Sequence, residues 1–304
     1  MICVYYTSWS SPWVSDANKM DLAMVKDLYP GVDCVNISFA QPDMNYSYGS
    51  FNGTGLNFSQ DFYVVVGAIK ILKSKGVIVM LSVGGGSYWS ESKNCNVNDW
   101  ARLANDLGCD GIDIDWEVSA SKDYELTDAI KRLKSLYFGK ISFAGFSTGA
   151  YGKRDGDQYM GMNIDAMVNV GGFVDWINIM TYDAGPTFDP LGALDCYRIY
   201  YPGPLNIGYE VGVQSWGGYL LTKDDVIRMA TYSKNNSNKN GVFIWCLGKA
   251  GNPSVSDIVS ICYDIFNTKN NASDSIPKAP SAPTLPDASV TMKCGVCNTV
   301  YQKK

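Results

Sequence analysis

Eight short apolar runs, rich in β-branched and aromatic residues, recur along this chain, and helical patterns follow them. The runs occupy residues 2–6, 32–40, 76–83, 111–116, 141–147, 176–182, 205–212 and 241–248. Helix-like segments include residues 59–76, 96–108, 122–140, 222–235 and 254–266. Eight strand-then-helix units predict an α/β fold, a (β/α)8 TIM barrel. An open doubly wound sheet is the alternative, but its glycine-rich dinucleotide fingerprint is absent.

The chain changes character near its C-terminal end. Of its 304 residues, 46% are apolar and 18% are charged, which suits one large folded domain or two small ones. We therefore predict a barrel domain over residues 1–270. Residues 271–304 are rich in proline and small polar residues and contain a CxxC pair, so we expect a linker and a short disordered C-terminal tail. The CxxC pair lacks two of the four ligands of a structural zinc site, although another chain could complete it.

Charge and hydropathy argue against several classes of partner. A net charge of −5 without a long basic run disfavours nucleic acid. No apolar run reaches the roughly 18 residues of a membrane span, so we expect no membrane insertion. The start MICVYYTSW lacks the features of a signal peptide, and the cysteines that lie in strand-like runs suit reduced core thiols. We expect a monomer without cofactor or metal.

One strand-like run, GCDGIDIDWEVS at residues 108–119, carries four acidic residues. Side chains alternate along a strand, so Asp113, Asp115 and Glu117 share one face and the apolar residues between them share the other. In a barrel the apolar face packs under the helices. The three carboxyls then line the interior and rise toward the C-terminal mouth, where barrel active sites lie. Asp110 has the opposite parity, which predicts a structural role at the start of the strand.

Three carboxyls this close cannot all be ionised at neutral pH, because like charges in a poorly hydrated site raise one another's pKa. At least one proton is shared. We expect a protonated Glu117 at the mouth as a general acid, with Asp115 as its ionised neighbour. The alternatives are a solvated charge cluster or a magnesium site, although three carboxyls along one strand make a poor octahedral cage.

Five motifs in the same order resemble those of glycoside hydrolase family 18, which contains chitinases and endo-β-N-acetylglucosaminidases. DGIDIDWE resembles the DxxDxDxE signature of the family, and LSVGGG at residues 81–86 resembles its SxGG motif. YYTSW, MTYD at residues 180–183 and GVFIW resemble the first, sixth and last strands. The resemblance covers nearly all of residues 1–268 and implies a TIM barrel that acts on N-acetylglucosamine polymers.

The resemblance also implies roles for individual residues in a retaining, substrate-assisted hydrolysis. Glu117 would protonate the glycosidic oxygen while the substrate's own acetamide attacks the anomeric carbon. Asp115 would orient the acetamide and stabilise the cyclic cation, and Asp113 would hold or relay a proton. The remaining residues of the implied pocket would bind the sugar: Tyr182 the acetamide carbonyl, Trp245 the sugar's face, and Tyr5, Phe39, Gly85, Met180 and Asp183 the walls.

Several alternatives stay open at this stage. About 25 residues separate the seventh and eighth runs, so the α+β insertion of larger exo-acting chitinases is missing, which favours endo cleavage of chitin or its oligosaccharides. An endo-β-N-acetylglucosaminidase acting on N-glycan cores is one alternative, and a chitin-binding lectin without activity is another. The compartment also stays open: the cysteines suit the cytoplasm or non-classical export, whereas the family is usually extracellular.

Overall fold

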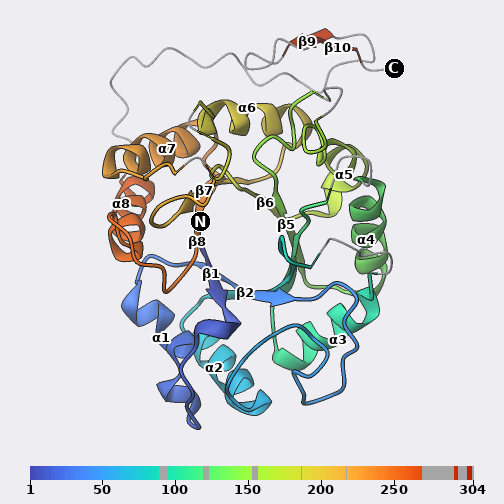
Figure 1. Cartoon of the computed structure of the whole chain (residues 1–304), viewed down its shortest axis with the longest axis vertical. Helices are drawn as coiled ribbons and strands as arrows, with labels where there is room; N and C mark the ends of the chain where they lie inside the picture. The colour runs from blue at the N-terminus through green and yellow to red at the C-terminus, as the bar shows by residue number, and fades with distance from the viewer. Residues whose placement is uncertain are drawn as a thin grey trace.

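The computed structural model describes most of the chain as a single barrel (Figure 1). The described residues are 1–88, 95–118, 123–152, 157–185, 187–216, 218–268, 291–293 and 300–302. Of the predicted tail, only two segments fall within them: β9 (Thr291–Lys293) and β10 (Val300–Gln302), which pair antiparallel. The rest of the tail, including its CxxC pair, lies outside the described residues, and the boundary at residue 270 stays a prediction.

Eight parallel strands close the barrel, and each pairs with its neighbours in the chain, so β1 also pairs with β8. Their bounds are β1 (Ile2–Thr7), β2 (Cys34–Ala40), β3 (Ile78–Gly84), β4 (Gly111–Asp115), β5 (Lys140–Gly145), β6 (Trp176–Ile179), β7 (Leu205–Glu210) and β8 (Gly241–Trp245). The predicted TIM barrel is therefore confirmed. Several strands end sooner than their apolar runs, because the last residues of those runs belong to the loops at the mouth.

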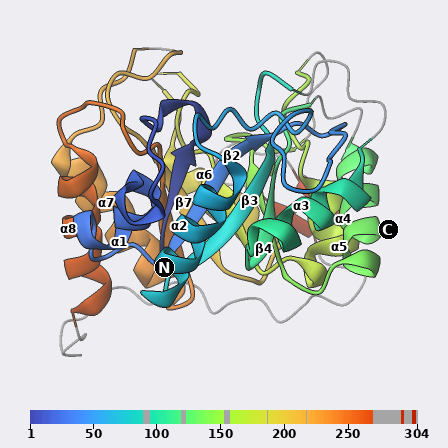
Figure 2. The same cartoon turned by 90° about the horizontal axis from the view of Figure 1, so that it is seen from below.

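Helices surround the strands (Figure 1), and the view from below shows helices on both sides of them (Figure 2). The α-helices among the described residues are α1 (Asp21–Leu28), α2 (Phe62–Ser74), α3 (Val97–Leu107), α4 (Asp123–Leu136), α5 (Ile164–Val170), α6 (Pro190–Tyr200), α7 (Lys223–Asn236) and α8 (Val255–Asn267). Short 3-10 helices are η1 (Ser8–Ser10), η2 (Ala17–Lys19) and η4 (Gly171–Phe173). None of the described helices is long and apolar enough to cross a membrane.

Local sequence signals explain where these helices begin and end. The buried residues of α2 include Phe62, Val65, Ile69 and Leu72, a spacing of three and four that forms one face toward the strands. Helices α7 and α8 each begin with a capping box, in which a Thr or Ser and an Asp three residues later satisfy each other's backbone N–H groups. Helix α3 ends at Gly108, which adopts the left-handed conformation.

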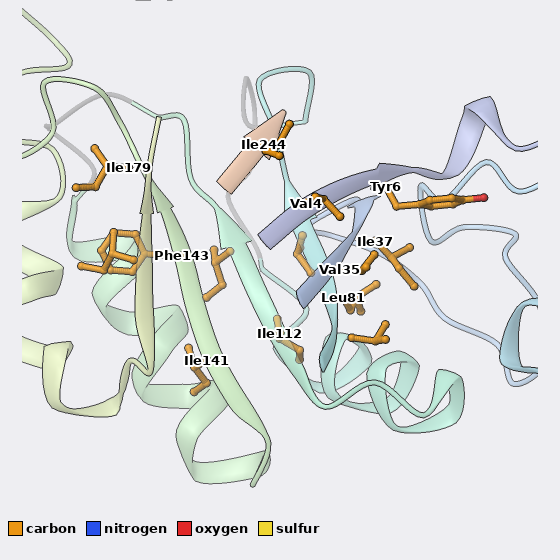
Figure 3. Close-up of a cluster of buried hydrophobic side chains, with 14 of the residues drawn as sticks. Val4, Tyr6, Val35, Ile37, Leu81, Ile112, Ile141, Phe143, Ile179 and Ile244 are labelled. Carbon is orange, nitrogen blue, oxygen red and sulfur yellow. The ribbon is translucent and has the colours of Figure 1, made fainter. Parts of the chain in front are cut away.

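The apolar core has two layers, one on each side of the strands. Between strands and helices lies the larger layer, which includes Val4, Ile37, Leu81, Ile112 and Ile244 (Figure 3). Inside the barrel, a smaller layer combines aromatic rings, methionines and thiols, among them Tyr5, Met80, Trp176, Phe243 and Cys3. Five cysteines have free thiols: Cys3, Cys34, Cys109, Cys246 and Cys262. Packing on both faces fixes which side chains of each strand face the interior.

A recurring hydrogen bond joins the strands in pairs at the bottom of the barrel. The residue just before each even-numbered strand accepts a hydrogen bond, through its side-chain oxygen, from a backbone N–H at the start of the preceding strand. The pairs are Asp33 with Ile2 at 2.9 Å, Asp110 with Val79 at 2.9 Å, Asp175 with Ile141 at 2.9 Å and Asn240 with Leu205 at 3.1 Å. The predicted structural role of Asp110 at a strand start is therefore confirmed.

We predict that Asp110→Ala lowers the free energy of unfolding by about 1–3 kcal/mol, because the Val79 N–H loses its acceptor. Asp110→Asn is the matched control: it keeps an oxygen for Val79 and loses mainly the partly exposed ion pair with Lys73, which should cost less than about 1 kcal/mol. Denaturant unfolding measures both. Equal losses in the two variants would mean that the charge, and not the hydrogen bond, carries the effect.

Candidate active site

Strand β4 places its acidic side chains inside the barrel and its apolar ones outside. Asp113 is fully buried and Asp115 is 5% exposed, whereas Ile112, Ile114 and Trp116 pack in the outer core. The alternation predicted from the sequence is therefore confirmed. Glu117 lies two residues beyond the strand and is partly exposed, at the mouth.

Asp113 lies at the centre of a hydrogen-bond network. Its Oδ2 accepts from the hydroxyls of Tyr5 and Ser82, both at 2.8 Å, and its Oδ1 accepts from Ser142 at 2.6 Å and from the Asn178 amide at 3.5 Å. The two serines are the register partners of Asp113 in β3 and β5, so strand pairing alone brings them to it. The pKa of Asp113 is raised because burial outweighs these bonds, which lower it.

The two other carboxyls are perturbed by burial and by each other. Burial raises the pKa of Asp115 well above its ordinary value, and the charges of Glu117 and Asp113 raise it further. Burial also raises the pKa of Glu117, as does the charge of Asp183, while a hydrogen bond from the Gly86 backbone lowers it. Burial therefore favours the neutral form of these carboxyls, and a protonated Glu117 beside an ionised Asp115 stays a prediction.

Aromatic rings form the floor and one wall of the site. The Phe39 and Trp245 rings are stacked, with centroids 5.5 Å apart and an interplanar angle of 21°. Tyr5 meets the Trp245 ring edge-on at 5.7 Å, and Tyr182 meets Phe243 in the same way at 5.9 Å. Strands β1, β2 and β8 supply the first three of these residues, so the closure of the barrel brings them together.

Two glycines follow β3 where larger residues would disturb the site. Gly85 has a φ of +82°, and a Cβ there would lie 2.8 Å from the Phe39 ring. Its N–H donates to the Asp115 carbonyl at 3.0 Å, which holds the loop on β4. At Gly86 a Cβ would lie 3.4 Å from a carboxylate oxygen of Glu117. Small residues therefore keep this side of the mouth open.

The segment after β6 carries three predicted pocket residues. Met180 is buried in the inner layer with Tyr182 packed against it. Asp183 has a φ of +49°, uncommon for a residue with a side chain. Its carboxylate accepts from the Trp216 N–H at 2.8 Å, and its own N–H donates to the Gln214 side chain at 3.0 Å. Asp183 therefore anchors the loop between β7 and α7 to the site.

All ten predicted site residues come from the mouth or the upper interior of the barrel, and the structure adds others. The residues that the sequence reasoning missed are Ser82, Ser142 and Asn178, which donate to Asp113, and the buried Glu210. Alternation within their apolar runs was a usable signal, because each polar residue lies on the face opposite its apolar neighbours.

Chemically, the site combines a proton donor with a desolvated negative pocket. Burial favours the neutral form of carboxyls at the mouth, and the aromatic floor offers a flat apolar surface. Within the part of the chain that the structure describes, no cluster of three or more His, Cys, Asp or Glu side chains could hold a metal ion.

Sequence comparisons add independent findings. The family model described as "Glycosyl hydrolases family 18" matches residues 1–192. A chitinase of Plasmodium falciparum is 33% identical over 132 residues, which cover 39% of this chain and 32% of that protein. Endochitinase 1 of Metarhizium anisopliae is 26% identical over 225 residues, 67% of this chain and 52% of that protein. The chain thus spans a third to a half of the length of these curated relatives.

Solved structures share the fold at low identity. A GH18 chitinase from Pseudoalteromonas aurantia has a TM-score of 0.63 and 22% identity, and the match covers 85% of this chain and 97% of that one. A fungal endo-beta-N-acetylglucosaminidase from family 18 has a TM-score of 0.65 and 16% identity, with coverage of 88% and 98%. A xylanase and alpha-amylase inhibitor protein, XAIP-I, has a TM-score of 0.54 and 18% identity, with coverage of 87% and 97%. At these identities the likeness concerns the fold alone.

We predict that Gly85→Ala lowers the free energy of unfolding by about 2 kcal/mol or more, because it combines an unfavourable φ with a clash against Phe39. Gly172→Ala is the matched control, since a Cβ there meets nothing within 4 Å. Denaturant unfolding followed by tryptophan fluorescence measures both variants. If they were equally stable, the contact between Gly85 and Phe39 would not restrict this position.

Proposed function

Because the chain belongs to the glycosyl hydrolases of family 18, we propose that it hydrolyses β-1,4-linked N-acetylglucosamine polymers as an endo-chitinase. The observation that carries the proposal is a row of three carboxyls: Asp113 and Asp115 lie on β4 inside the barrel, and Glu117 lies just beyond the strand at the mouth. Two residues at the same mouth, Trp245 and Tyr182, fit the sugar ring and its acetamide. Chitin or its oligosaccharides are the proposed partner, and a monomer stays a prediction.

Glu117 is the proposed general acid. Its raised pKa favours the protonated form that a general acid needs, and its position at the mouth is accessible to a glycosidic oxygen. When Glu117 transfers its proton to that oxygen, the bond to the leaving sugar breaks. The acetamide carbonyl oxygen of the remaining sugar bonds to the anomeric carbon, which gives a cyclic oxazolinium ion.

Asp115 is the proposed stabiliser of that cation. A carboxyl whose pKa is raised by burial becomes ionised most readily when a positive charge develops beside it. Asp113 takes up the displaced proton, since it is the next carboxyl inward on the same strand face. Water activated by the ionised Glu117 then attacks the anomeric carbon, which restores the acetamide and gives a retained product.

The loops support internal cleavage. Only 30 residues separate Glu210 at the end of β7 from Gly241 at the start of β8, and α7 takes up 14 of them. A bridge between Val213 and Leu220 closes a short hairpin before that helix. No further domain fits between these strands, so a polymer chain can enter the groove from either side.

A product time course tests the proposal. N-acetylglucosamine oligomers of defined length are incubated with the protein, and the anomers are resolved at early times. We expect internal cleavage with the β anomer formed first, because two successive inversions at the anomeric carbon give retention. A high-mannose glycoprotein is the parallel substrate. Cleavage of that substrate alone would indicate an endo-β-N-acetylglucosaminidase, and oligomer binding without any product would indicate a lectin.

We predict that Glu117→Gln lowers kcat by about 10² or more and leaves oligomer binding largely intact, because the amide keeps the shape but has no proton to donate. Steady-state hydrolysis and a binding titration measure the two effects. Glu125→Gln is the control, since Glu125 lies on α4 outside the barrel. A Glu117→Gln variant within about tenfold of the wild-type rate would contradict the assigned role.

A further inference from the structure

Glu210 is a buried carboxyl beside the sugar site to which the proposed mechanism assigns no task. It is the last residue of β7 and is 2% exposed. Its parity matches that of Asn206, whose amide donates to Asn178 inside the barrel at 2.9 Å. Glu210 therefore faces the interior, four residues further toward the mouth.

The strand register places Glu210 next to the proposed sugar floor. Its partner across the β7 and β8 pairing is Trp245, and side chains of register partners lie on the same face. The charge of Glu210 also contributes to the raised pKa values of Tyr182 and Cys246, which puts its carboxyl near both. A sugar stacked on Trp245 would thus have Glu210 at its edge.

The two oxygens of Glu210 differ in their partners. Oε1 accepts from the Lys249 ammonium at 2.5 Å, whereas no N–H or hydroxyl group of the residues that the structure describes donates to Oε2. Burial raises the pKa of Glu210, the adjacent Asp183 raises it further through its charge and a hydrogen bond between the two side chains, and Lys249 lowers it. A buried acceptor without a donor is rare in folded proteins unless a ligand or water completes it.

The charges around Glu210 indicate which kind of hydrogen-bond donor would fit its Oε2 oxygen. Two carboxyls repel an anion, and Lys249 already supplies a cation, so a neutral hydroxyl fits best. In a β-1,4-linked N-acetylglucosamine chain, C1 and C4 carry the linkages and C2 carries the acetamide. The 3-hydroxyl and the 6-hydroxyl are therefore the hydroxyl groups of an internal sugar that remain free to donate.

We propose that Glu210 is a substrate-binding residue whose Oε2 accepts a hydrogen bond from a free ring hydroxyl or the 6-hydroxyl of the sugar on Trp245. Lys249 holds the carboxylate in place through Oε1. This inference rests on the proposed function, because it takes the ligand to be an N-acetylglucosamine chain. The rival explanation is an ion pair that only stabilises the loop after β8.

The test compares kcat/KM for three oligomers: intact, 3-deoxy and 6-deoxy. For the wild-type protein we expect the ratio of kcat/KM for the intact oligomer to kcat/KM for one of the two deoxy oligomers to be about 10 or more. The reason is that a site built for a hydroxyl rejects analogues that lack it. In Glu210→Leu, which keeps the volume without an acceptor, this ratio should fall to about twofold or less. Any intrinsic effect of the missing hydroxyl on reactivity is common to both proteins and cancels.

Lys249→Met is the matched control, because it breaks the same ion pair but keeps the Glu210 carboxyl. Because Lys249 positions the carboxylate, the ratio should fall below the wild-type value but stay above that of Glu210→Leu. If Glu210→Leu does not fold, Glu210→Gln replaces it, and its neutral amide should lower the ratio by about threefold or more. Ratios that are the same in the wild type and the Glu210 variants would overturn the inference and leave the proposed function standing. A wild-type protein that cleaves no oligomer would overturn both.

Discussion

A carboxyl group at the centre of a barrel has no bulk water around it, so its neighbours must supply hydrogen bonds. Asp113 meets this requirement with four donors, and these come from β1, β3, β5 and β6. A shift in the register of any of these strands would remove a donor from a buried charge. One side chain therefore ties the pairing of half the barrel to the base of the site, and Asp115 and Glu117 rise from that base.

Much of this arrangement could be predicted from the sequence, because a strand has a single strict periodicity. The alternation in GIDID determines which face each carboxyl takes, and the order of eight runs determines that this face is the interior. The family motifs then located Tyr5, Tyr182 and Trp245, which lie far apart in the chain and meet only through barrel closure. Their chemical roles remain predictions.

The features that could not be predicted from the sequence depend on how deeply a side chain is buried and on which residues it meets on neighbouring strands. Glu210 alternates like any polar strand residue, and only its burial and its pairing with Lys249 mark it out. Ser82 and Ser142 become meaningful once the register sets them beside Asp113. The sequence pattern also gives no measure of burial, which raises the pKa of all three carboxyls. The alternation of residues along a strand does not indicate how much water reaches each side chain.

The side-chain hydrogen bonds at the bottom of the barrel recur at every second strand interface, so they link the eight strands in four pairs. They join β1 to β2, β3 to β4, β5 to β6 and β7 to β8, whereas the interfaces in between show no such bond among the described residues. A cut in the chain between β4 and β5 would keep all four bonds inside the two resulting fragments, whereas a cut between β3 and β4 would sever one. New chain ends, for circular permutation or for reassembly from halves, are therefore best placed at the boundaries between strand pairs.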